Sequence, residues 1–249
     1  MDFLAIKDIA EKFMELVNPT STEKIVEAGR LLKLEPGLRV LDFGCGYGEM
    51  LGLWGTKFGI GGVGIDIRSE SVRRAKAKMF NLGLDEQIEI VQGKGAEYAF
   101  EPGSYDVATC VGASFIWDGF ADALHHMRPA LKPDGNILIG EPYWLTTLVP
   151  PELSRSESYF HTEFELLKLA RQEGFEVLTI LRSSLDEWDN YESGNWRGLL
   201  HWLNRNPDHP EWDDVYTHLR ESQEEYFQFG REYFGWALYL LTQTPDSLT

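Results

Sequence analysis

Short runs of β-branched and other apolar residues alternate with stretches of helical periodicity along most of the chain. The helical spacing is clearest in residues 69–82, where Val72, Ala75 and Met79 fall on one face. Such alternation predicts a doubly wound α/β fold, in which helices cover both faces of a parallel sheet. Seven strands are expected, at 39–43, 62–66, 88–91, 105–111, 136–140, 175–180 and 233–242.

The remaining segments suggest one domain with an inserted helical part. Residues 1–34 carry two stretches of helical periodicity, the first over residues 3–17. Residues 35–183 with 230–243 hold all the expected strands. Between the last two strands lie residues 184–229, which contain no strand pattern and are rich in Trp, Tyr, Asp and Glu. Because compact domains rarely contain so long a structureless connection, we expect these residues to form a helical cap.

The segment Asp42-Phe-Gly-Cys-Gly-Tyr-Gly48 follows an expected strand and opens an expected helix. In that setting glycines allow a sharp turn and the close approach of a ligand to the backbone. The spacing is G-x-G-x-G, and Glu49 occupies the place of the third glycine of a dinucleotide fingerprint. Carboxylates at Asp42 and Glu49 would oppose a pyrophosphate and suit a ligand that carries a positive group.

Asp66 ends the second expected strand, 22 residues after Gly44. An acid at this distance from a glycine loop is placed to accept hydrogen bonds from ribose hydroxyls. A helix cap is the alternative role of a strand-terminal Asp.

Four ordered motifs resemble those of the class I S-adenosylmethionine-dependent methyltransferases: VLDFGCGYG, GIDI, SYDVA and LKPDGNILIGEP. The resemblance covers residues 25–183 and the last strand, and it implies a Rossmann-like fold whose last strand is antiparallel. It also implies S-adenosylmethionine as the cofactor. Its implied binding residues are Asp42, Gly44, Cys45 and Gly46 around the methionine part, Asp66 at the ribose, Ile67 against the adenine, and Val111 and Gly112 near the amino group.

One position departs from the family pattern. Many relatives carry Gly-Asp-Ala after the third strand, whereas this chain has Gly93-Lys94-Gly95-Ala96. A lysine cannot accept a hydrogen bond from the adenine amino group. Recognition of adenine is therefore expected to use the backbone of Lys94, Gly95 and Ala96, or the side chain of Glu97.

The acceptor site is less clearly marked. Methyl transfer depends largely on positioning, so a single catalytic residue is not required. Glu141, at the end of the fifth strand, could act as a base or orient an acceptor, or it could form a structural ion pair. The expected acceptor-binding residues are Trp117, Tyr143, Trp188 and Tyr191, with core packing as the alternative for each aromatic side chain. For the cap, a dimer interface is the competing interpretation.

The amino-acid composition limits the classes of binding partner. The 249 residues include 23 Lys and Arg against 40 Asp and Glu, a formal net charge of −17, so nucleic acid and anionic membranes are poor partners. We expect a neutral or cationic small molecule as the acceptor and a homodimer as one possible assembly. We expect no metal, since no Cys, His or acidic cluster has ligand spacing. Two cysteines and no signal-peptide pattern favour the cytoplasm.

Two alternatives remain open at this point. An NAD-dependent oxidoreductase would share the architecture, although Asp42 and Glu49 argue against it. A non-catalytic binding or scaffold protein could also keep the fold, and Lys94 leaves room for it.

Overall fold

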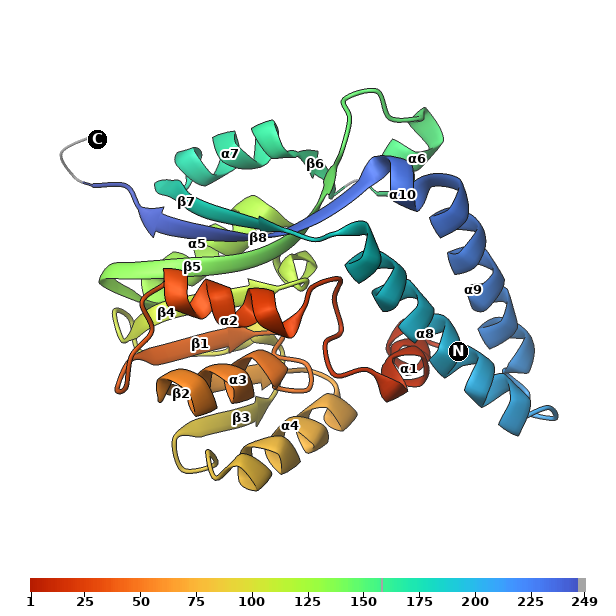
Figure 1. Ribbon diagram of the computed structural model, residues 1–249, viewed down its shortest axis with the longest axis horizontal. Coiled ribbons are helices and arrows are strands. Elements are labelled where there is room, and N and C mark those ends of the chain that lie inside the picture. The colour runs from red at the N-terminus through yellow and green to blue at the C-terminus, as the bar shows by residue number, and fades with distance from the viewer. Residues whose placement is uncertain (158, 246–249) are drawn as a thin grey trace.

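The computed structural model describes residues 1–157 and 159–245. It contains one mixed sheet with the strand order β3-β2-β1-β4-β5-β8-β7, with a short strand β6 paired to β5 (Figure 1). The first five strands are parallel, and β8 runs antiparallel to both β5 and β7. The strands are β1 (Arg39–Phe43), β2 (Gly61–Asp66), β3 (Ile88–Gln92), β4 (Tyr105–Val111), β5 (Leu131–Trp144), β6 (His161–Thr162), β7 (Phe175–Arg182) and β8 (Phe234–Gln243).

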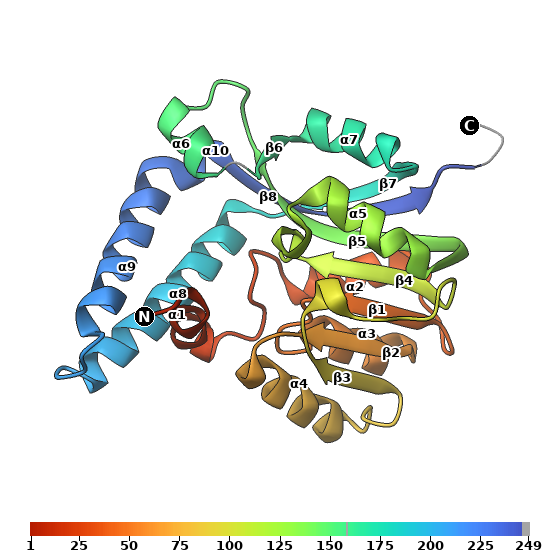
Figure 2. The same cartoon turned by 180° about the vertical axis from the view of Figure 1, so that it is seen from behind.

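Helices cover both faces of this sheet, which confirms the doubly wound architecture (Figures 1 and 2). Alternate residues of one strand point to opposite faces, so Val40 packs under α2, α3 and α4 while Leu41 packs under α5 and α7. The helices are α1 (Phe3–Ala10), α2 (Thr22–Leu31), α3 (Glu49–Phe58), α4 (Ser69–Leu82), α5 (Phe120–Met127), α6 (Pro151–Ser156), α7 (Glu163–Gln172), α8 (Leu185–Arg205), α9 (Trp212–Glu225) and α10 (Arg231–Tyr233).

The expected seven strands are present, and the two-residue strand β6 is an addition to them. Strand β5 begins earlier than its apolar run, because Lys132–Gly135 belong to the strand as an irregular stretch. Tyr105 pairs with Leu131 but Val107 pairs with Asn136, so the extra residues bulge out of the ladder. The Gln243 side chain donates to the carbonyls of Lys132, Pro133 and Gly135 and supports this bulge.

Between β7 and β8 the chain forms two long helices, α8 and α9. Ser184 caps α8 through a capping box with Glu187, and α9 continues into a π-helical turn, η5 (Tyr226–Gly230). Helix α1 packs beside α8 and not on the sheet, as both overall views show. The periodicity over residues 3–17 had predicted a longer helix, but α1 ends at Ala10 and a 3-10 turn, η1 (Glu11–Phe13), follows it.

Candidate functional site

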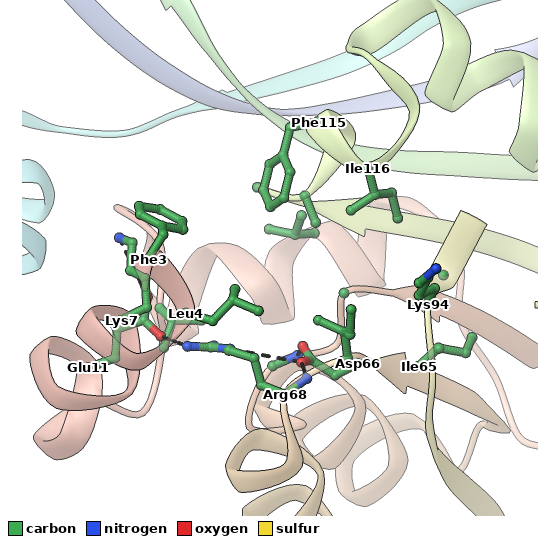
Figure 3. A pocket seen from close by; sticks show the side chains of 18 of the residues that line it. Phe3, Leu4, Lys7, Glu11, Ile65, Asp66, Arg68, Lys94, Phe115 and Ile116 are labelled. Carbon is green, nitrogen blue, oxygen red and sulfur yellow. Dashed lines mark hydrogen bonds and ion pairs between the residues drawn. The ribbon is translucent and has the colours of Figure 1, made fainter. Parts of the chain in front are cut away.

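A cavity of about 490 Å³ opens at the carboxyl ends of β1, β2 and β4 (Figure 3). Loops that follow four strands form its floor and one wall, while α1 and one residue of α8 form the opposite wall. This is the edge at which open α/β sheets bind ligands. Its lining consists of Phe3, Leu4, Lys7, Glu11, Val17, Gly44, Gly46, Ile65, Asp66, Ile67, Arg68, Lys94, Gly95, Ala96, Val111, Gly112, Ala113, Phe115, Ile116 and Tyr191.

The glycine loop after β1 is folded back against β2. The amides of Gly44 and Cys45 both donate to the Ile65 carbonyl at 2.9 Å. Gly44 has φ +72°, and a Cβ added there would lie 2.5 Å from the Ala113 Cβ. The turn therefore requires glycine for its conformation and for its close contact with the loop after β4, and it leaves the backbone open to a ligand.

Asp66, 7% exposed, ends β2 at the centre of the cavity. Its Oδ2 accepts from the Gly46 amide at 2.9 Å, and its Oδ1 accepts from the Arg68 amide at 2.9 Å. Each carboxylate oxygen can accept more than one hydrogen bond. The Asp66 carboxylate is thus oriented by the backbone and can still accept hydrogen bonds from the hydroxyls of a ligand.

On one side of Asp66 the cavity is lined by apolar side chains and by backbone atoms. Ile67 is 48% exposed there, and it shares the cavity with Ile116 and the short turn η2 (Gly95–Glu97). The Lys94 ammonium lies 2.7 Å from a Glu97 carboxylate oxygen, at the surface. The arrangement fits a flat, apolar ring system whose polar edge meets the backbone of residues 94–96.

Asp42 and Cys45 line a smaller hollow of about 40 Å³ that adjoins the main cavity. Val17, Gly44 and Val111 line both spaces. Burial raises the pKa of Asp42 to about 7, although the hydrogen bond that Thr109 Oγ1 donates to it at 2.7 Å opposes the shift. A cationic group placed near Asp42 would favour its ionised form.

Glu141 lies behind the cavity wall and does not line it. It is 2% exposed, and its Oε1 accepts from the Ser114 hydroxyl at 2.8 Å. Ser114 opens the 3-10 turn η3 (Ser114–Trp117), whose Phe115 and Ile116 do line the cavity. Burial raises the pKa of Glu141 to about 8, against the effect of the Ser114 hydrogen bond, so at neutral pH this carboxyl is mainly protonated.

The structure separates the four expected acceptor-binding aromatics, and Tyr191 alone among them lines the cavity. Trp117 stacks on His126 and packs against Phe43, and it belongs to the core of the sheet. Tyr143 is buried, and its ring fills the space beside Gly235. Trp188 packs against Tyr226 and the sheet.

The cavity contains residues that the sequence patterns did not reveal. Phe3, Leu4, Lys7 and Glu11 come from α1 and the turn after it, and they face the strand ends across the cavity (Figure 3). Their spacing is that of an ordinary amphipathic helix, so no local signal marks them. In the turn η3 the sequence pointed to Trp117, whereas Phe115 and Ile116 are the residues that line the cavity.

Within residues 1–157 and 159–245, no group of three or more His, Cys, Asp or Glu side chains is placed to hold a metal ion. The helices of the same residues include none with the length and apolar character needed to cross a membrane.

The fold and the cavity together define an α/β protein with a ligand-sized cavity at the carboxyl ends of its parallel strands. A model of the methyltransferase domain matches residues 40–135. The structure superposes on an S-adenosylmethionine-dependent methyltransferase of Thiobacillus denitrificans in complex with S-adenosyl-L-homocysteine, with a TM-score of 0.90 and 35% identity over 98% of this chain and 100% of that one. This chain belongs to the S-adenosylmethionine-dependent methyltransferase family.

Two further relatives extend the comparison. The uncharacterized protein YjhP of Escherichia coli K12 is 36% identical over 97% of this chain and 99% of its own length. A 24-methylenesterol C-methyltransferase 2 of Oryza sativa is 30% identical over 68% of this chain, which spans about half of that enzyme, 52%. The methyltransferase interpretation and the S-adenosylmethionine cofactor are thus confirmed over the NAD-dependent alternative.

Proposed function

We propose that this methyltransferase acts on a neutral small molecule with an apolar body, which it binds between α1, η3 and Tyr191. One observation carries the proposal: the cavity continues past the glycine loop to the side chains of Phe3, Leu4 and Phe115. Phe3 and Phe115 are each 60% exposed, which is far more than a side chain of the core, so they offer apolar surface to a ligand.

Charge supports a neutral acceptor over a cationic one. The ionised side chains that line the cavity are Lys7, Arg68 and Lys94 against Glu11 and Asp66, a formal balance of 3 − 2 = +1. The name of the sterol methyltransferase relative also indicates an apolar acceptor in that protein. The sequence favoured either a neutral or a cationic acceptor, and the charge of the cavity lining supports the neutral one.

The cofactor-binding roles follow the same geometry and are part of the proposal. Asp66 would accept from the ribose hydroxyls, while the backbone of Lys94, Gly95 and Ala96 with Ile67 would hold the adenine. The methionine part would meet the glycine loop at Gly44, Cys45 and Gly46, where a Cβ at Gly44 could not be accommodated. The carbonyls of Val111 and Gly112, with Asp42, would face its amino group.

When bound, S-adenosylmethionine supplies a methyl group on a positively charged sulfur. The contribution of the protein is to orient the acceptor and to exclude water, which the apolar walls at Leu4, Phe115 and Ile116 favour. Glu141 would act as a positioning residue, because its hydrogen bond with Ser114 fixes the turn that carries Phe115 and Ile116. The Tyr191 hydroxyl, which accepts a hydrogen bond from Lys7 Nζ at 3.4 Å, is a polar group of the cavity wall that would hydrogen-bond to the acceptor.

The experiment is methyl transfer from S-adenosylmethionine labelled in its methyl group, offered to fractionated cell extract and to panels of neutral apolar alcohols and phenols and of amines. We expect the label in an extract fraction of apolar neutral compounds, with mass spectrometry identifying the product. An Asp66→Ala variant should abolish transfer and serves as the blank. Label found in amines and absent from neutral compounds would contradict the proposal.

The cellular setting is likewise proposed. Cys45 and Cys110 are both free, which agrees with a reducing compartment such as the cytoplasm. The exposed side chains of Tyr216 and Phe227 in the cap leave a homodimer as a testable state, which light scattering of the purified protein decides.

A further inference from the structure

Helix α1 packs against the cap helices α8 and α9, although it lies near the N-terminus and the cap lies near the C-terminus. Its buried residues Ile6 and Ala10 pack in one cluster with Leu199 and Leu203 of α8 and with Val215 of α9. The contact between the helices is very close, because a Cβ added at Gly198 would lie 2.1 Å from the Ala10 carbonyl oxygen. Helices α1, α8 and α9 therefore share an apolar core that is distinct from the two cores of the sheet.

The cofactor cavity lies between this cap and the strand ends, and Glu11 connects the two sides. Its carboxylate lies 2.6 Å from Arg68 Nη1 and 3.7 Å from Lys7 Nζ. Arg68 in turn donates through its backbone amide to Asp66, and its Nε lies 3.9 Å from the same carboxylate. A line of charges thus runs from Asp66 through Arg68 and Glu11 to Lys7, as Figure 3 shows.

The Glu11–Arg68 pair is buried, so the loss of one partner costs more than it would in a surface ion pair. Glu11 is 4% exposed, and the Arg68 side chain keeps 11% of its surface accessible. Burial alone would lower the pKa of Arg68, but Glu11 and Asp66 outweigh it and raise that pKa. Removing one partner of such a pair leaves the other charge buried and unpaired, which is costly.

Asp8 offers a natural contrast on the same helix. It also lies near Arg68, at 3.4 Å, but its side chain is 35% exposed and it does not bridge to Lys7. Exposed ion pairs of this kind contribute little. Glu11 is thus the carboxylate through which α1 is fixed at the cavity.

We propose that Glu11 is a positioning residue for the cofactor: by bridging Arg68 and Lys7 it holds α1, with Phe3 and Leu4, as the wall against which S-adenosylmethionine packs. A cofactor that fills the cavity displaces water from the Arg68–Glu11 pair, which strengthens the pair in the lower local dielectric. Cofactor binding and the order of α1 are therefore coupled. The proposal rests on the cofactor placement given above and is independent of the acceptor.

S-adenosyl-L-homocysteine alone is a sufficient probe. Its dissociation constant is measured by calorimetry for the wild type, Glu11→Gln and the matched control Asp8→Asn, and hydrogen exchange follows residues 3–13 and 44–48 with and without it. For Glu11→Gln we expect the dissociation constant to rise at least about 10-fold, as for a lost hydrogen bond to a charged group. The added protection of residues 3–13 should be lost while that of residues 44–48 persists. For Asp8→Asn we expect a change below about 5-fold.

Three results would overturn the proposal. One is a folded Glu11→Gln variant that binds the probe as the wild type does and still protects α1. The second is an equal rise of the dissociation constant in Asp8→Asn, which would mean that Glu11 has no role beyond that of any carboxylate beside Arg68. If Glu11→Gln fails to fold, Gly198→Ala displaces α1 while keeping every charged side chain, and an unchanged dissociation constant in that variant is the third. Failure of the wild type itself to bind the probe would count instead against the cofactor placement.

Discussion

The backbone amide of Gly46 donates a hydrogen bond to the Asp66 carboxylate at 2.9 Å. The loop after β1 and the end of β2, which stand 20 residues apart, are thereby held in one geometry. Asp66 consequently has two tasks, since the same carboxylate that orders the loop is proposed to receive the ribose.

Replacing Asp66 by Asn should disturb both tasks. One carboxylate oxygen becomes an amide donor, which would face either the Gly46 or the Arg68 amide. The affinity for S-adenosyl-L-homocysteine should fall about 10- to 100-fold, since hydrogen bonds to charged groups are involved. Calorimetry measures this, with Asp85→Asn on the exposed surface as the control. Equal affinities of the two variants would show that the ribose lies elsewhere.

Gly44 and Gly103 allow the effect of a clash to be separated from that of backbone strain. Both have positive φ, +72° and +67°, but an added Cβ meets Ala113 at 2.5 Å only in the case of Gly44, and nothing within 4 Å at Gly103. Gly103→Ala should lower the free energy of unfolding by about 1 kcal/mol and leave S-adenosyl-L-homocysteine binding intact. Gly44→Ala should weaken binding at least about 10-fold in addition, because Ala113 or the loop must move. Binding by Gly44→Ala at wild-type strength would contradict the assigned role of the loop.

The sheet could be predicted because its signals are local. Strand residues such as Val40 and Leu41 are apolar on both faces, as buried parallel strands require, and glycines mark the loop that follows. The antiparallel last strand came from the resemblance to a family and not from the pattern itself. The Lys132–Gly135 bulge was missed because Lys-Pro-Asp-Gly has the composition of a turn, whereas pairing with β4 and support from Gln243 keep it in the strand.

The proposed acceptor side of the cavity could not be predicted, because its residues meet through contacts between distant segments. Ile6 and Ala10 bury the apolar face of α1 against α8 and α9, and this packing turns Phe3 and Leu4 toward the strand ends. No spacing in residues 3–13 encodes that arrangement. Trp117 ends η3 after β4, and Tyr143 lies near the end of β5, so both are at the correct edge of the sheet. Their side chains nevertheless pack into the core, which the residue spacing does not reveal.

Glu141 should make stability depend on pH. The folded protein raises the pKa of this carboxyl from 4.5 to about 8, so between these values the folded state holds a proton that the unfolded state releases. Its contribution therefore becomes more unfavourable as pH rises through this window, by at most about 1.4 kcal/mol per pH unit. Glu141→Gln removes the titration and can still accept from Ser114.

The measurement is the difference in free energy of unfolding between Glu141→Gln and the wild type from pH 5 to pH 8, by urea titration. We expect the variant to gain stability relative to the wild type as pH rises. The exposed Glu35→Gln serves as the control and should give a nearly constant difference. A difference for Glu141→Gln that does not vary with pH would mean that the carboxyl is ionised in the folded protein.

Tyr191 and Trp188 both lie on α8 and contact each other, with ring centroids 6.3 Å apart. Tyr191 lines the cavity and Trp188 does not. Tyr191→Ala should lower methyl transfer into cell extract at least about 10-fold while S-adenosyl-L-homocysteine affinity changes less than about 3-fold, because the side chain lies on the acceptor side. Trp188→Ala should instead cost about 2–3 kcal/mol of stability, less than full burial would give, since the ring packs on Tyr226. Thermal unfolding, calorimetry and light scattering distinguish these effects. If Tyr191→Ala changes the oligomeric state and leaves transfer intact, α8 forms an interface and the acceptor binds elsewhere in the cavity.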